Sequence, residues 1–215
     1  SPWGIAAGAD GSMWFTEYEG NRIGRISMGG MTSEFVVPTA GAVPWGIAAG
    51  ADGSMWFTEN MGNRIGRITA TGIVTEFAVP SAGVIPLGIA AGPDGAMWFT
   101  EYTGNKIGRI TTSGAMSEFM VPTTGAFPYL IAAGPDGAMW FTEFTGNKIG
   151  RITMGGVVTE FAVPTTGANP AAIAAGPDGS MWFTEWGGNR IGRITTSGVV
   201  TEFAVPTANV DPVGI

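Results

Sequence analysis

The stretch Gly92-Pro-Asp-Gly-Ala-Met-Trp-Phe-Thr-Glu101 recurs along the whole chain with small changes. Its other copies occupy residues 8–17, 50–59, 134–143 and 176–185, so each copy begins 42 residues after the one before. A repeat of fixed period is typical of an architecture in which similar supersecondary units stack on one another. The period therefore predicts the architecture before any single residue is considered for chemistry.

Each copy predicts four short strands. In the third copy, four runs favour β-structure, at residues 87–92, 96–101, 106–111 and 116–122. Turn-forming residues such as Pro-Asp-Gly and Gly-Asn separate these runs. No apolar period near 3.6 residues extends far enough to predict a helix. Four strands per copy are typical of one propeller blade, whereas the alternative, a β-solenoid, has shorter coils with fewer hairpin turns.

We therefore predict an all-β fold, a single β-propeller domain over residues 1–215 with five blades of four antiparallel strands. The blades are expected at about residues 2–43, 44–85, 86–127, 128–169 and 170–211, and residues 212–215 begin a sixth copy. A blade packs on both faces, so Trp98, in the middle of its strand, is expected to be buried.

The two ends of the chain offer the same segment of the repeat, Pro2–Ile5 and Pro212–Ile215. In a five-bladed ring they compete for one inner strand position. We expect Pro2–Ile5 to occupy it, because this segment continues directly into the rest of the strand, and the tail to lie on the surface.

Composition argues against several classes of function. The chain has 10 basic and 17 acidic residues, a net charge of −7, and no stripe of positive charge that could neutralise phosphates, so nucleic-acid binding is not expected. It has no Cys and no His, which excludes disulfides and the usual zinc ligands. The apolar runs are too short to cross a membrane as helices. A soluble monomer is expected; no signal peptide is visible, and the compartment stays open.

The unit Pro86-x-Gly-Ile-Ala-Ala-Gly-Pro-Asp-Gly-x-Met-Trp-Phe-Thr-Glu101, followed by Gly-Asn-x-Ile-Gly-Arg-Ile-Thr111, resembles the streptogramin B lyase (virginiamycin B lyase) family. The resemblance covers every copy. It implies a propeller, commonly of seven blades, whose upper face opens a cyclic depsipeptide by elimination with Mg²⁺, a histidine and glutamates. The family histidine follows a strand-two Glu by two residues; the matching positions here are Glu19, Met61, Thr103, Thr145 and Gly187.

The copies differ from one another mainly in two connections. In a four-stranded meander, the turn after strand two and the link to the next blade lie at the same end, and both are rich in aromatic residues here. Varied aromatic residues above a uniform core predict a ligand-facing surface; drift of exposed loops is the alternative. The candidate ligand-binding residues are Trp3, Tyr18, Trp45, Asn60, Leu87, Tyr102, Tyr129, Phe144 and Trp186.

The recurrent charged residues have a structural interpretation. Glu101 and Lys106 flank a four-residue turn and are expected to pair across the two strands, and Arg109 is expected to face Trp98. The alternative is a ring of five carboxylates that binds a cation. The Asp of each Asp-Gly pair is expected to serve its turn, so no metal site is predicted.

The function expected from these patterns is a non-catalytic scaffold or binding module without a cofactor, with an aromatic upper face for a small molecule, glycan or peptide. It could also be a product of recent repeat amplification or design. Because the chain has no His to exchange a proton near neutral pH, an enzyme is disfavoured. The alternative is a lyase-like enzyme that opens a cyclic depsipeptide by elimination with Mg²⁺.

Overall fold

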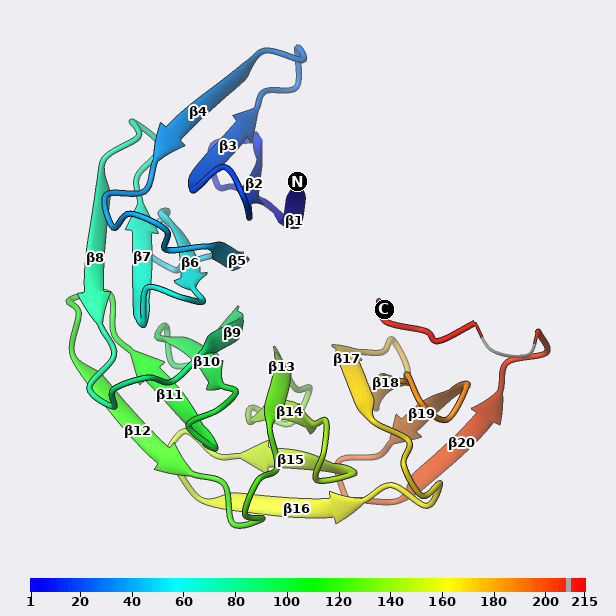
Figure 1. The fold of residues 1–215 in the computed structure, drawn as a ribbon. Helices are drawn as coiled ribbons and strands as arrows, with labels where there is room; N and C mark the ends of the chain where they lie inside the picture. Colours follow the sequence, from blue (N-terminus) through cyan, green and yellow to red (C-terminus); the bar gives the residue numbers. More distant parts are fainter. Residues whose placement is uncertain (208–209) are drawn as a thin grey trace. The chain divides into compact units, whose positions relative to one another are not determined.

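A computed structural model describes residues 1–207 and 210–215, and these residues form twenty β-strands and no helix. The strands make five four-stranded antiparallel sheets, each with its strands side by side in chain order (Figure 1). The prediction of an all-β propeller with five four-stranded blades is confirmed. No helix in the described part of the chain is long and apolar enough to cross a membrane.

The strand bounds repeat from sheet to sheet. The first sheet contains β1 (Pro2–Ala7), β2 (Met13–Glu17), β3 (Arg22–Ile26) and β4 (Thr32–Val36), and the second contains β5 (Pro44–Ala49), β6 (Met55–Glu59), β7 (Arg64–Ile68) and β8 (Val74–Ala78). The third contains β9 (Pro86–Ala91), β10 (Met97–Glu101), β11 (Lys106–Ile110) and β12 (Met116–Met120). The fourth contains β13 (Pro128–Ala133), β14 (Met139–Glu143), β15 (Lys148–Ile152) and β16 (Val158–Ala162). The fifth contains β17 (Pro170–Ala175), β18 (Met181–Glu185), β19 (Arg190–Ile194) and β20 (Val200–Ala204).

Two compact units divide the chain, and their boundary runs through the third sheet. The first unit comprises Ser1–Ala91, Gly95–Phe99 and Gly108–Ser117, and the second comprises Gly92–Asp94, Thr100–Ile107 and Glu118–Ile215.

Consecutive sheets within a unit share one apolar interface. In the first unit, Trp14 packs in one cluster with Met55 and Phe57 of the next sheet. In the second unit, Trp140 packs in the same way with Met181 and Phe183. Trp98 is 0 % exposed, so the expectation that it is buried is confirmed. Both faces of an inner sheet are therefore core, which explains why its strands are almost continuously apolar.

The glycine of each Ile-Gly-Arg-Ile strand makes room for an aromatic ring. Phe57 and Gly66 are direct partners across β6 and β7. A Cβ atom on Gly66 would lie 2.1 Å from Cζ of Phe57, far inside contact distance. The repeat therefore keeps glycine here because the ring of strand two lies directly over the backbone of strand three.

A threonine joins each inner strand to the next one. Thr58 accepts a hydrogen bond from the backbone N–H of Gly46 in its own sheet (2.9 Å). Its hydroxyl then donates to the carbonyl of Leu87 in the following sheet (2.8 Å). In the second unit, Thr142 links Leu130 to Ala171 in the same way (3.1 and 2.7 Å). One hydroxyl thus satisfies two buried backbone groups of neighbouring sheets.

The Asp of the Asp-Gly turn connects its turn to the tryptophan and the arginine of the same sheet. One oxygen of Asp52 accepts from the Ser54 N–H (3.2 Å) and the Trp56 indole N–H (3.1 Å), and the other accepts from Arg67 (2.6 Å). Burial alone would raise the pKa of Asp52, but the hydrogen bonds from Trp56 and Arg67 outweigh it and hold that pKa below its ordinary value. The interpretation of these Asp residues as turn residues therefore agrees with the contacts.

The expected arginine–tryptophan contact is also present. Cζ of Arg109 lies 5.8 Å from the centre of the Trp98 ring, and Arg67 lies 5.8 Å from Trp56. Each indole is therefore covered by a cation on one side and by apolar side chains on the other.

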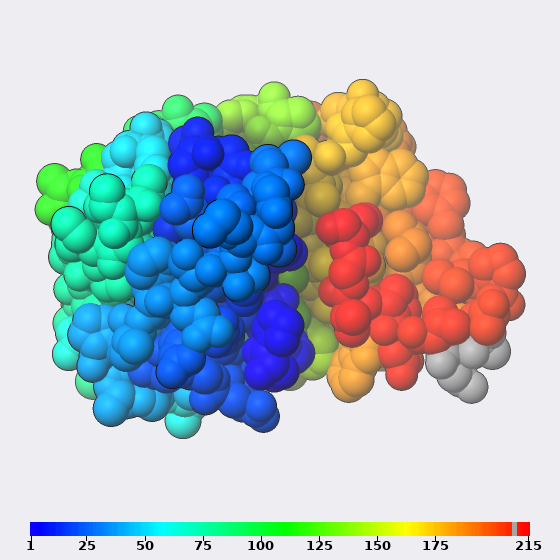
Figure 2. Space-filling model, turned by 90° about the horizontal axis from the view of Figure 1, so that it is seen from above, coloured from blue at the N-terminus to red at the C-terminus, as the bar shows by residue number. Residues whose placement is uncertain are grey.

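The terminal segments differ as expected. Pro2–Ala7 forms β1 and pairs with β2, whereas residues 211–215 form no strand. The C-terminal residues lie on the surface (red in Figure 2). Closure of five blades within one chain stays a prediction.

Removing a buried tryptophan should be costly. We expect Trp98→Ala to lower the free energy of unfolding by about 3–5 kcal/mol, because it leaves a large cavity in a core that cannot collapse fully. Trp182, at the same position of the fifth sheet, is only half-buried, so Trp182→Ala is the matched control and should cost clearly less. Chemical denaturation measures both variants; equal costs would contradict the two-faced packing.

Candidate functional site

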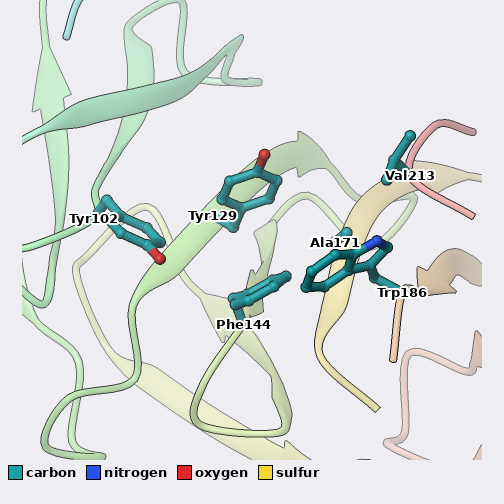
Figure 3. A pocket seen from close by; sticks show the side chains of 6 residues that line it. All are labelled: Tyr102, Tyr129, Phe144, Ala171, Trp186 and Val213. Carbon is teal, nitrogen blue, oxygen red and sulfur yellow. The ribbon is translucent and has the colours of Figure 1, made fainter. Parts of the chain in front are cut away.

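Four aromatic side chains gather at one end of the second unit. Each sheet is a meander, so the turn after strand two and the link to the next sheet lie at the same end, which we call the upper end. Tyr129 lies between Tyr102 and Phe144, with ring centres 6.1 and 5.6 Å away, and Trp186 follows 5.5 Å from Phe144. We call these four residues the aromatic row (Figure 3).

The aromatic row lines a cavity of about 430 Å³, together with Ala171 and Val213. Trp186 is 42 % exposed, and the other three rings are half-buried, so a ligand could reach all four without a change of fold. Burial and the neighbouring Tyr102 raise the pKa of Tyr129, so its phenol stays neutral. The cavity therefore offers aromatic surface and neutral hydroxyl groups rather than charge.

Backbone hydrogen bonds hold the row in place. Tyr102, Phe144 and Trp186 each directly follow strand two of their sheets. The N–H of Phe144 donates to the carbonyl of Phe127 (3.1 Å), and the N–H of Trp186 donates to that of Asn169 (3.3 Å). The link that enters a sheet thus fixes the turn that carries its aromatic residue.

In the first unit, three other predicted residues form a smaller cluster. Trp3 lies 6.1 Å from Tyr18 and 5.7 Å from Trp45, measured between ring centres. Trp3 is 58 % exposed, whereas Trp45 is 9 % exposed and belongs mostly to the core. This cluster therefore has three aromatic residues, one of them largely buried, whereas the row has four.

Two further predicted residues, Asn60 and Leu87, do not line the cavity of the aromatic row. Leu87 is buried, and its carbonyl accepts the hydrogen bond from Thr58. Asn60 is half-buried and donates its N–H to the carbonyl of Val43 (3.1 Å). These hydrogen bonds are structural and bring neither residue to the cavity.

Sequence reasoning did not select three residues at this end of the second unit. Ala171 and Val213 line the cavity, and Phe127 contacts Tyr102 with ring centres 4.9 Å apart. Phe127 and Ala171 occupy varied positions of the link between sheets, so that variation was the available signal. Nothing in the sequence marks Val213 as a cavity residue.

The glutamates that end strand two are buried in four sheets. Glu59, Glu101, Glu143 and Glu185 are each 0 % exposed, and neither carboxyl oxygen has a hydrogen-bond partner within the described residues. Burial, reinforced by a second glutamate on strand four of the same sheet, raises the pKa to about 8 in Glu59, Glu101 and Glu143. The same causes raise the pKa of Glu185 to about 7. These carboxyls are therefore neutral over much of the physiological range.

The expected cross-strand pairing of Glu101 with Lys106 has its counterpart in the ladder of the fourth sheet, where Glu143 and Lys148 are direct partners, but the lysine's ion pair is made elsewhere. Lys106 donates instead to Glu118 on β12 (3.2 Å), and in the fourth sheet Lys148 donates to Glu160 (2.9 Å). The strand-four glutamate is less buried and so stays charged at lower cost than the strand-two glutamate. Among the residues described by the structure, no group of three or more His, Cys, Asp or Glu converges as a metal site would require.

Comparison with known proteins gives one consistent result. The model of the virginiamycin B lyase family matches residues 1–215. Virginiamycin B lyase from Staphylococcus aureus aligns with a TM-score of 0.97 and 46% identity, over 99% of this chain and 73% of that one. None of the curated proteins compared with this chain matches it.

Two further structures agree with this result. A catalytically inactive histidine-to-alanine variant of the Staphylococcus aureus enzyme with quinupristin aligns with a TM-score of 0.96 and 46% identity, over 99% of this chain and 73% of that one. A streptogramin B lyase aligns with a TM-score of 0.94 and 45% identity, over 98% of this chain and 70% of that one.

The buried glutamates make stability depend on pH. Their ordinary pKa is 4.5 and rises to about 8 on folding, so between these values the unfolded chain has released protons that the folded chain keeps. The contribution of these groups to the free energy of unfolding should therefore be largest below pH 4.5. It should fall as the pH rises towards 8, by at most about 1.4 kcal/mol per pH unit for each proton.

Urea denaturation from pH 5 to 8 measures this slope. Glu59→Gln stays uncharged at every pH and should make the slope shallower, and Glu59→Gln with Glu143→Gln should make it shallower still. A free energy of unfolding that increases across this range would contradict the raised pKa values.

Proposed function

The chain belongs to the virginiamycin B lyase family, and from this premise we propose that it opens cyclic depsipeptides of the streptogramin B class by elimination. The observation that carries the proposal is the match of the family to the whole chain, together with an aromatic cavity at the upper end of the second unit.

The expectation of a non-catalytic scaffold or binding module is wrong. That expectation rested on the missing histidine. The family match covers all five copies, however, and the similar structures at 45–46% identity are lyases. A single residue type is weaker evidence than a pattern that extends over every blade.

The aromatic row suits the apolar part of a cyclic depsipeptide. A related lyase is described in a complex with quinupristin. The cavity of about 430 Å³ is large enough for side groups of such a ring, and Tyr102, Tyr129 and Trp186 offer flat surfaces for them. Aromatic surface at an accessible site binds apolar rings at low cost in conformational entropy.

The elimination needs a proton acceptor. A base takes the proton next to a carbonyl group, a carbon–carbon double bond forms, and the ester C–O bond breaks to release a carboxylate within the opened chain. Because the chain has no histidine, a carboxylate is the acceptor that these residues can offer. Glu185 directly precedes Trp186, and its pKa of about 7 matches a base that works near neutral pH.

The turn after strand two passes close to the carboxyl group of Glu185 at Gly188. A Cβ atom on Gly188 would lie 2.6 Å from Oε2 of Glu185, so a larger residue would collide with the carboxylate. We assign Glu185 the role of proton acceptor because it directly precedes Trp186 of the cavity; its carboxyl is fully buried, so it can act only when the turn at Gly188 moves aside as the depsipeptide binds.

Mg²⁺, which the family resemblance implies, does not fit the described residues. Each buried glutamate has one other carboxylate of its sheet beside it, and in the fourth sheet that carboxylate, Glu160, is held by Lys148 and Thr123. Magnesium requires near-octahedral oxygen ligands that are free to coordinate. No step of the proposed reaction therefore depends on the metal.

Incubation with quinupristin tests the proposal. We expect a ring-opened product with the mass of the substrate, since elimination adds no water, detected by chromatography with mass spectrometry. Glu185→Gln should slow turnover about a hundredfold or more, the usual contribution of a general base. Trp186→Ala should lower kcat/KM about tenfold, the loss of about 1.4 kcal/mol of contact.

The matched control is Glu59→Gln, which removes the same buried carboxyl in the first unit and should leave turnover unchanged. Unaltered quinupristin, or a product heavier by one water, would refute the elimination. Equal losses in Glu59→Gln and Glu185→Gln would instead show that the glutamates act through stability.

A further inference from the structure

In four copies of the repeat, the residue before the proline at the start of the copy has an unusual backbone. Val43, Phe127, Asn169 and Asp211 occupy this position in different copies, with φ of 56°, 51°, 48° and 42°. All four are in the left-handed region, and all four precede a proline. We call this position the link position.

Two of these residues are poor choices for such a backbone. Asn and Asp tolerate the left-handed region because their short polar side chains bond locally. Val and Phe do not, since their Cβ atoms approach the following carbonyl oxygen, and a following proline adds a further restriction. Val43 and Phe127 are therefore strained where Asn169 is not.

The backbone at the link position is imposed by the turn above it. The carbonyl of Val43 accepts the N–H of Asn60 (3.1 Å), that of Phe127 accepts Phe144 (3.1 Å), and that of Asn169 accepts Trp186 (3.3 Å). Asn169 makes this bond without strain, and its side chain also donates to the carbonyl of Phe144 (2.9 Å). An asparagine thus meets every structural demand of the position.

Phe127 makes a contact that an asparagine could not. Its ring lies 4.9 Å from Tyr102, between ring centres, with an interplanar angle of 53°. Tyr102 lines the cavity, and Phe144, which the Phe127 carbonyl holds, lines it too. Phe127 therefore supports two members of the aromatic row, one by its ring and one by its backbone, without lining the cavity itself.

We propose that Phe127 is a positioning residue, kept at a strained backbone position because its ring holds Tyr102 against the bound depsipeptide. The inference rests on the proposed function of the aromatic row. Local strain persists at ligand-binding positions when the surrounding structure enforces it, and here the ring supplies a reason to retain it. The backbone support of Phe144 does not need the ring, so only the contact with Tyr102 depends on the residue type.

Substitution by asparagine separates stability from binding. Phe127→Asn removes the ring and relieves the backbone, and Val43→Asn is the matched control, relieving the same strain in the first unit. We expect both variants to melt at or above the temperature of the unaltered protein. Phe127→Asn should weaken quinupristin binding about fivefold or more, as expected for the loss of one aromatic contact, and Val43→Asn should leave it unchanged.

Two further variants complete the test by isothermal titration. Phe127→Tyr keeps the ring and should keep the affinity, whereas Phe127→Gly removes the ring in a residue suited to the backbone and should reproduce the loss. Affinity and melting temperature that fall together in Phe127→Asn and Phe127→Gly would overturn the inference, because the role would then be structural.

The same titration distinguishes failure of the inference from failure of the proposed function. If Trp186→Ala weakens quinupristin binding while Phe127→Asn and Phe127→Gly do not, the row binds the ligand and the role of Phe127 is wrong. If the unaltered protein does not bind quinupristin, both proposals fail.

Discussion

The tryptophan of strand two is the residue on which each sheet depends. In the second sheet, the indole N–H of Trp56 donates to Asp52, and Arg67 lies over the ring. Met97 and Phe99 of the following sheet pack in the same apolar cluster as Trp56. A single four-stranded sheet could not bury this residue alone. The repeat is therefore stable through the interfaces between consecutive sheets, and the threonine hydrogen bonds tie the inner strands across the same interface.

The core and the lower end repeat from copy to copy, whereas the side chains at the upper end vary, because the contacts that hold the upper turns are largely made by the backbone. The aromatic row draws its members from strand-two turns and one inner strand of consecutive sheets, so a change at one position leaves the repeated core intact. The buried glutamates beneath these turns carry an energetic cost, because each carboxyl stays protonated well above its ordinary pKa. Stability and the protonation of these groups are thus coupled by the same burial.

The errors of sequence interpretation have physical causes. Glu101 and Lys106 are adjacent in the ladder, but the lysine reaches across to Glu118, where the resulting ion pair is less deeply buried. The missing histidine led to the expectation of a non-catalytic scaffold, whereas the family match over residues 1–215 and the lyase structures at 45–46% identity support the enzyme. Leu87 was selected for its variation, yet the structure buries it, since variation alone does not say on which side of the sheet a residue lies.

The sequence by itself determined the fold class, the five copies, the strand and turn positions and the burial of Trp98, because each of these follows from local propensity and from a period that every copy repeats. It also indicated the upper end as the varied end. Only the tertiary structure decided which of the varied residues meet, since Tyr102, Tyr129, Phe144 and Trp186 come from different copies. It alone revealed the strained Phe127 and the raised glutamate pKa values, because backbone angles and burial depend on how the sheets pack on one another.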